Sequence, residues 1–178
     1  MKAVNASKKT SHRTPSSLIM TLNHLHLVLN HIPVLGTAFG LGLLVYGIWR
    51  KSTELKKTAL GVFVLAALMT IPVDLTGEPA EEGVEGLPGV SETIIEQHEE
   101  AAGVAFASIG VLGVMALIGL LALRHGKDVP AWFAGVMVIA SFTVSGLMAK
   151  TANMGGQIRH TEIRPDAVKP NAVSKDRD

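Results

Sequence analysis

Histidines are the residues of this chain whose type and spacing could support chemistry. Three of them, His24, His26 and His31, lie within eight residues, inside a stretch from Thr14 to Trp49 that contains no Asp, Glu, Lys or Arg. Histidine is costly to place at membrane depth and usually has a function there. Because neutral imidazole is the commonest ligand for metals and for haem iron, this stretch indicates a redox or metal protein.

Four apolar segments must position these histidines. They cover residues 18–49, 58–73, 101–123 and 129–149, and 48% of the 178 residues are hydrophobic. Each segment is close to the roughly 20 residues with which a helix crosses a bilayer. None has the polar stripe that a helix exposed to water requires. We therefore predict an all-α fold, a four-helix transmembrane bundle with both termini on the same side.

The predicted bundle occupies residues 17–160. Residues 1–16 form a flexible polar N-terminal arm in this prediction, and residues 161–178 form a polar, disordered tail. The segment 74–100 holds nine carboxylates and no Lys or Arg. Its glycines and prolines predict a loop in the first half, and Ser91 is the expected N-cap of the third helix.

Charge predicts the orientation. The loops after the first and third helices carry four and two Lys or Arg residues, whereas the acidic segment between them carries none. Since Lys and Arg favour the cytoplasmic side, the acidic segment is expected outside. This predicts an integral protein of the bacterial inner membrane, with its site near the periplasmic face.

Composition excludes several classes of site. Cysteine is absent, which excludes disulfides, iron–sulfur clusters and covalent c-type haem. The basic residues form no patch interleaved with aromatic residues, so nucleic acid is not an expected partner. The sequence has no recognisable nucleophile–base pair or phosphate-binding loop. An electron-transfer subunit is therefore favoured over a stand-alone enzyme, although an enzyme is not excluded.

Helix geometry places five of the seven histidines in one thin layer. A span of about 20 residues, rising roughly 1.5 Å per residue, was counted from the basic residues Arg50 and Arg124. The count brings histidines from three separate parts of the chain to one membrane boundary. They are His24, His26, His31, His98 and His160. This convergence predicts haem b, one or two molecules, each held by two imidazoles from different helices.

His24 with His98 is the first predicted ligand pair, since both lie at similar depth. His31 with His160 is the second, if a turn at residues 155–156 folds the following segment back over the bundle. Arg159 is then the expected partner of a haem propionate.

A transition-metal binding or transport module is the alternative function. It would use His24, His31, His98 and His160 together with carboxylates of the acidic segment. A structural subunit of a membrane complex is a third interpretation.

Four motifs carry a resemblance to a known family. They are HLVLNHIP at residues 26–33, DLTGEPAEE at 74–82, HE at 98–99 and GGQIRH at 155–160. Together they resemble a largely uncharacterised family of small four-span bacterial membrane proteins. The resemblance implies that His26 and His31 are the defining pair of the first helix, and it implies no particular activity. The architecture is similar to that of membrane b-type cytochromes.

The expected function is therefore that of a membrane-embedded b-type cytochrome. It would transfer electrons as a subunit of a respiratory or electron-transfer assembly, in contact with membrane lipid and other subunits. The acidic segment could steer a basic soluble carrier, such as a c-type cytochrome, toward the haem.

Overall fold

The computed structural model describes residues 16–124 and 128–165. Most of the predicted N-terminal arm, and the predicted tail beyond residue 165, lie outside these residues. Within them the chain is helical and contains no strand. Four stretches are long and apolar enough to cross a membrane: Thr21–Trp49, Thr53–Leu75, Glu92–Ala122 and Ala131–Arg159. The predicted all-α bundle of four transmembrane helices is confirmed.

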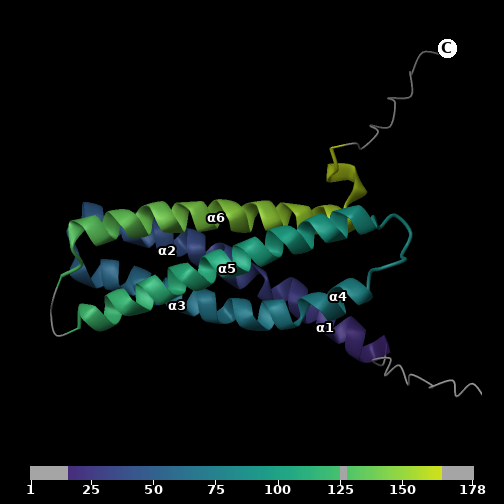
Figure 1. Ribbon diagram of the computed structural model, residues 1–178, viewed down its shortest axis with the longest axis horizontal. Coiled ribbons are helices and arrows are strands. Elements are labelled where there is room, and N and C mark those ends of the chain that lie inside the picture. The colour runs from purple at the N-terminus through teal and green to yellow at the C-terminus, as the bar shows by residue number, and fades with distance from the viewer. Residues whose placement is uncertain (1–15, 125–127, 166–178) are drawn as a thin grey trace, which may run out of the picture.

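Five helices build these four stretches. They are α1 (Ser16–Leu29), α2 (His31–Trp49), α3 (Thr53–Leu75), α5 (Glu92–Ala122) and α6 (Ala131–Arg159). Helix α2 packs on α3, α3 on α5, α5 on α6, and α6 on α2, which closes a ring. The beginning of α1 and the end of α6 lie at the same end of the bundle (Figure 1).

The first span is broken at Asn30, between α1 and α2. Pro33 has no backbone N–H, so it leaves the carbonyl of Leu29 without its helical donor and crowds it. The imidazole Nδ1 of His31 reaches back one turn and donates to the carbonyl oxygen of Leu27 at 2.7 Å. Helix α1 leaves the ring at this break and packs mainly against α4.

The acidic segment differs from the predicted loop. Helix α3 continues through Pro72 to Leu75, and a short helix α4 (Gly77–Glu82) follows. Glu78 and Pro79 occupy its first turn, where a carboxylate and a proline are both favourable. Helix α5 then begins at Glu92 with Ser91 as its N-cap residue, as predicted. The acidic segment is thus partly helical and packs against α1.

Small residues let the helices approach closely. A Cβ on Gly36 would lie 3.2 Å from Ala66, and a Cβ on Gly40 would lie 2.6 Å from Phe63, both on α3. Gly113 of α5 contacts Ala67 of α3 in the same way. Glycines at such crossings are typical of membrane helix pairs. The larger fully buried residues of the core are Leu44, Leu60, Phe63, Ile109, Leu112 and Met137.

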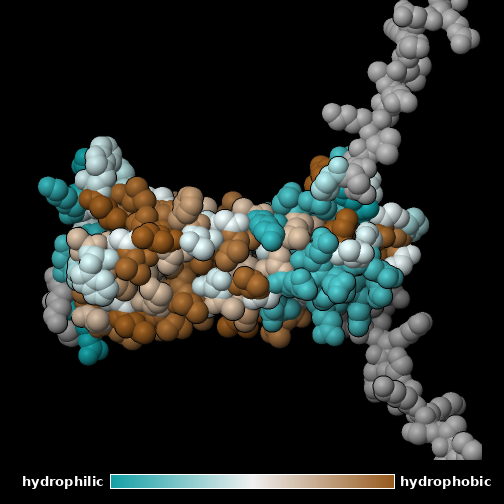
Figure 2. All heavy atoms as spheres, turned by 45° about the horizontal axis from the view of Figure 1, so that its top comes forward, coloured by the Kyte–Doolittle hydropathy of each residue, from teal (hydrophilic) through white to brown (hydrophobic). Residues whose placement is uncertain are grey.

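The outer surface of the bundle is apolar. Large hydrophobic side chains such as Phe39, Leu65, Ile139 and Phe142 are more than half exposed. Figure 2 shows hydrophobic residues over the left and middle of the face in view, with hydrophilic residues gathered at the end that holds α4. A continuous apolar belt of this kind fits contact with lipid rather than water.

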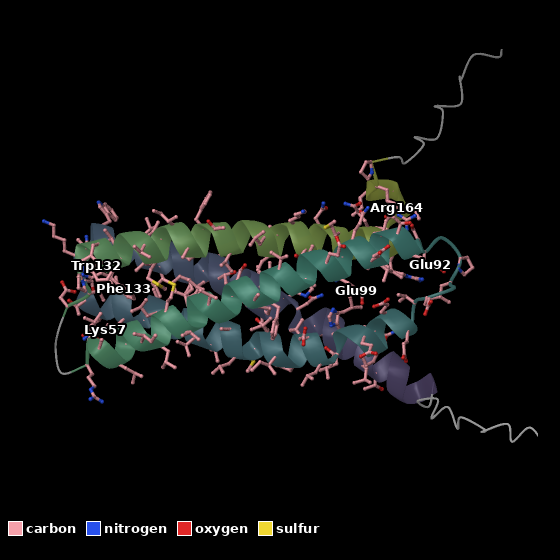
Figure 3. The ribbon with its side chains drawn as sticks, in the orientation of Figure 1. Lys57, Glu92, Glu99, Trp132, Phe133 and Arg164 are labelled. Carbon is pink, nitrogen blue, oxygen red and sulfur yellow. The ribbon has the colours of Figure 1, made fainter. Side chains whose placement is uncertain are left out.

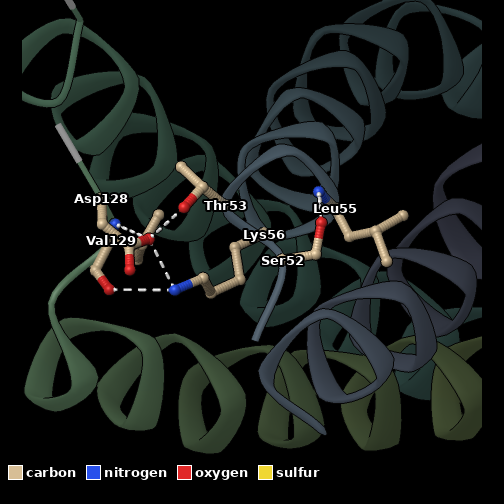
Figure 4. Close-up of polar contacts among 6 residues, drawn as sticks. All are labelled: Ser52, Thr53, Leu55, Lys56, Asp128 and Val129. Atoms are coloured by element: carbon tan, nitrogen blue, oxygen red, sulfur yellow. Dashed lines mark hydrogen bonds and ion pairs between the residues drawn. The ribbon is translucent and has the colours of Figure 1, made fainter. Parts of the chain in front are cut away.

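The basic end of the bundle carries a polar network (Figure 4). Lys56 of α3 is buried and its Nζ lies 2.6 Å from Oδ1 of Asp128, in the segment before α6. The same carboxylate oxygen accepts from Thr53 Oγ1 at 2.8 Å and from the backbone N–H of Val129 at 2.7 Å. The network joins the start of α3 to the start of α6, and the sequence analysis did not foresee it.

Exposed tryptophans mark the same end. Trp49, at the end of α2, and Trp132, in the first turn of α6, are 74% and 71% exposed. Figure 3 places Trp132 and Lys57 at the end of the bundle opposite Glu92 and Arg164. Tryptophan beside lysine is typical of the level of lipid headgroups. The two ends are therefore a basic end with tryptophans and an acidic end with histidines.

Candidate functional site

Buried residues recur at intervals of three and four along the helices, and we call each such line a core seam. The seam of α2 consists of Pro33, Thr37, Gly40, Leu44 and Gly47. The seam of α5 includes Ile95, Ala105, Ile109, Leu112 and Ala116. The seam of α6 consists of Ala134, Met137, Ser141, Val144 and Met148. His98 and Gly155 continue the seams of α5 and α6, and His26 continues that of α2 into α1. His98 and Gly155 therefore face the axis of the bundle at its acidic end, and His26 faces the end of α3.

His26 is half-buried and is held by the end of α3. Its Nδ1 lies 3.1 Å from the carbonyl oxygen of Val73 and 3.2 Å from Oγ1 of Thr76. The Thr76 hydroxyl itself donates to the carbonyls of Pro72 and Val73. Because a carbonyl oxygen can only accept, Nδ1 of His26 carries the proton. The last turn of α3 thus fixes the imidazole through the carbonyl of Val73.

His98 is half-buried and is held by α6. Its Nδ1 lies 3.1 Å from the carbonyl oxygen of Thr151 and is again the donor. The ring rests on Gly155, where an added Cβ would lie 3.0 Å from the ring carbon Cε1. Any larger residue at this position would push the imidazole away.

The turn expected at Gly155 and Gly156 is absent, because α6 runs without interruption to Arg159. Glycine was interpreted as a helix breaker, whereas Gly155 instead provides room for a side chain from another helix. The segment after these glycines consequently does not fold back over the bundle. The predicted pairing of His31 with His160 required this turn, and the turn does not form.

The two anchored imidazoles interact electrostatically, His26 on His98. Each has its Nδ1–H on a backbone carbonyl, so the lone pair of each ring is on Nε2. A ligating histidine is normally oriented by such a hydrogen bond from its other nitrogen. The site thus holds two oriented imidazoles, one from the first span and one from the third, each with a nitrogen lone pair that can accept a hydrogen bond or bind a metal.

Carboxylates lie beside this pair. Glu81 of α4 is hydrogen-bonded to Glu99, the residue after His98, and Figure 3 shows Glu99 between α5 and α4. This hydrogen bond, followed by partial burial and by repulsion from Glu99, Glu85 and Glu78, raises the pKa of Glu81 to about 7. Two carboxylates can share a hydrogen bond only if one holds a proton. The raised pKa therefore favours retention of a proton on Glu81 below about pH 7.

The other predicted ligands lie farther out. His24 is exposed on α1, and the structure places His26 rather than His24 beside His98. His31 is exposed, and its ring is hydrogen-bonded to the carbonyl of Leu27 on α1.

His160 and Arg159 end α6 and are both exposed. His160 Nδ1 lies 2.9 Å from Oε1 of Glu162. The pKa of Glu162 is lowered, first by a hydrogen bond from its own backbone N–H and then by His160. His160 and Glu162 thus pair with each other at the surface.

The chain remains ordered a little beyond the predicted boundary of the bundle. Residues Thr161–Ile163 form a short 3₁₀ helix, η1. The guanidinium of Arg164 donates to the carbonyls of Gln157, Ile158 and Gly89. It thereby ties the end of α6 to the loop before α5.

A non-haem metal centre finds little support in the geometry. Within residues 16–124 and 128–165, no three His, Asp or Glu side chains are grouped so that they could hold a metal ion. Comparisons with protein-family models, curated proteins and solved structures find no match for this chain. The arrangement of the site itself is therefore the basis for assigning a function.

Proposed function

We propose that this protein is a membrane b-type cytochrome whose haem is held by His26 and His98. One observation carries the proposal: both imidazoles are fixed through Nδ1 to backbone carbonyls of neighbouring helices, at 3.1 Å each, with Nε2 left to ligate. The haem would supply one-electron transfer. The two rings come from the first and third spans, as in other bundles that hold cofactors between facing helices.

The remaining residues prepare the site. Val73, Thr76 and Thr151 orient the rings, and Gly155 admits the ring of His98. Because the pair lies at the acidic end, a haem held there would lie near one membrane face, which we propose is the periplasmic side because the basic loops are at the other end. The exposed carboxylates there favour a basic soluble electron carrier. The protein would serve as a subunit of an electron-transfer assembly.

The absorption spectrum of the full-length protein, purified in detergent after expression with haem supplied, tests the proposal. We expect a low-spin b-type spectrum with one haem per chain. His26→Ala and His98→Ala should each abolish that low-spin spectrum. His24→Ala is the matched control, because His24 is exposed two residues away on the same helix, and it should retain the spectrum. A colourless wild-type protein, or retention of the spectrum in both His26→Ala and His98→Ala, would refute the proposal.

A further inference from the structure

The guanidinium of Arg164 joins two elements that are far apart in the sequence. Its Nε donates to the carbonyl oxygen of Gln157 at 2.9 Å, and its Nη2 donates to that of Ile158 at 3.1 Å, both near the end of α6. The same Nη2 donates to the carbonyl oxygen of Gly89 at 2.7 Å. Figure 3 shows Arg164 at the same end of the bundle as Glu92, the first residue of α5. The side chain therefore bridges the end of α6 and the loop that leads into α5.

The local structure explains how Arg164 reaches both elements. The last carbonyls of a helix have no helical N–H partner, and a basic side chain there stabilises them. After α6 the chain forms the 3₁₀ helix η1. Thr161 and Ile163 of η1 lie 3.6 Å from the positions that a Cβ would take on Gly89 and Gly156. We call residues 161–164 the C-terminal clip, since they contact both the loop before α5 and the end of α6.

The clip joins the two helices that hold His98. Helix α5 carries this residue about two turns, or roughly 10 Å, after its N-cap residue Ser91. Helix α6 supplies the carbonyl of Thr151 and the surface of Gly155 on which the ring rests. His26 is held differently, because its hydrogen bonds are with the end of α3. Separation of the start of α5 from α6 would therefore displace His98 and leave His26 in place.

Packing alone gives this part of α5 little support. Apart from Ile95, the helix has no buried residue before Ala105. A helix end with few buried contacts opens more readily than the core of a bundle. The three hydrogen bonds of Arg164 therefore act where packing is weakest along α5.

We infer that Arg164 is a positioning residue for His98. By joining Gly89 to the end of α6, it keeps the start of α5 against α6. The imidazole thereby stays on Gly155, with its Nδ1 on the carbonyl of Thr151. The consequence for haem rests on the proposed function, whereas the position of the imidazole does not.

Chemical modification of the histidines tests this role without haem. Diethyl pyrocarbonate acylates a neutral imidazole at its unprotonated nitrogen, and peptide mass spectrometry gives the rate at each residue. In the haem-free full-length protein in detergent, Arg164→Ala should raise the rate at His98 by about tenfold, the size expected for loss of a hydrogen bond made by a charged group. The rate at His26 should stay unchanged, because α3 holds that ring. An unchanged rate at His98, or an equal rise at both histidines, would overturn the assignment.

Two further variants test whether the guanidinium itself is the bridge. Arg159→Ala is the matched control, because Arg159 is an exposed arginine at the end of the same helix, and it should leave the rate at His98 unchanged. Arg164→Lys keeps the charge but presents one nitrogen in place of the guanidinium fork, so His98 should react nearly as fast as in Arg164→Ala. Full protection of His98 by the lysine, or its exposure in the control, would exclude bridging by the guanidinium.

Haem spectra of the same variants separate this role from the proposed function. Loss of His98 as an axial ligand would leave the iron high-spin, so Arg164→Ala should bind haem with a high-spin fraction that wild type and Arg159→Ala lack. A wholly low-spin spectrum together with an unchanged modification rate would remove Arg164 from the site and leave the cytochrome intact. A wild-type protein that never holds haem would refute the cytochrome, while the modification rates would still decide whether Arg164 positions His98.

Discussion

The imidazole of His98 on α5 lies on Gly155 of α6, where a Cβ would approach the ring to 3.0 Å. Gly155→Val should therefore displace the ring and weaken haem binding by about tenfold, a size typical of changes to residues that support a ligand. Haem titration of the apoprotein measures this. Gly156→Val is the control, since a Cβ there would make an ordinary contact of 3.6 Å with Ile163. Equal affinity in both variants would contradict the role of Gly155.

Thr76 gives a second prediction. Its hydroxyl lies 3.2 Å from Nδ1 of His26, so Thr76→Val removes one acceptor of that ring and should weaken haem binding by about tenfold. Thr70→Val provides the comparison, because Thr70 is also buried on α3 and also bonds to the carbonyl four residues back, at Ala66. We expect Thr70→Val to bind haem normally. If the two variants behaved alike, the hydroxyl of Thr76 would have no part in positioning His26.

Lys56 and Asp128 predict how stability responds to acid. Hydrogen bonds from Lys56 and then from Thr53 lower the pKa of Asp128 to about 2 from its ordinary 3.8. A lowered pKa means that the stabilisation is complete above about pH 4 and is lost as the pH falls toward 2. Thermal unfolding in detergent should therefore show wild type more stable than Asp128→Asn at pH 6, with the difference shrinking toward pH 2. A difference independent of pH would exclude the ion pair as its cause.

A double variant extends this test. Asp128→Asn alone leaves the ammonium group of Lys56 buried without its counter-charge, which is unfavourable. Lys56→Met together with Asp128→Asn removes both charges, so the double variant should unfold at a higher temperature than Asp128→Asn. The reverse order would indicate that the side chain of Lys56 is stable there without a partner.

Glu81 predicts a change of stability in the neutral range. Its pKa is raised from 4.5 to about 7 in the folded protein, mainly by the hydrogen bond with Glu99. The stabilisation is therefore complete below about pH 4.5 and is lost as the pH rises through 7. Glu81→Gln should unfold at a higher temperature than wild type at pH 8, and the gap should narrow toward pH 5. Glu82→Gln, on the exposed side of α4, should follow the wild-type profile; if it instead copied Glu81→Gln, the shared hydrogen bond would not be the cause.

Composition and capping residues were enough to predict the bundle. The uncharged apolar segments predicted the four spans, and Ser91 marked the start of α5 correctly. These features are local, so a single sequence contains them. The short helix α4 was missed because Gly77 and Pro79, and the glycines and proline that follow it, are typical of a loop.

The site was predicted less completely, because depth and helix rotation separate His24 from His26 without showing which of them faces the bundle. His24 and His26 have similar depth but face different sides. The direction was present in the sequence: Pro33, Gly40 and Gly47 repeat every seven residues, and seven residues before Pro33 is His26. Every residue has a backbone carbonyl, so residue types could not indicate that those of Val73 and Thr151 would accept from the imidazoles. Only the structure shows these hydrogen bonds.

The break at Asn30 separates the helix that carries His26 from the ring of α2, α3, α5 and α6, which closes without it. Closure of that ring consequently rests on its own contacts, and α1 is held to it by packing on α4 and by the hydrogen bonds from His26 to Val73 and Thr76. In the proposed cytochrome, one ligand would thus come from the ring and the other from an element docked onto it.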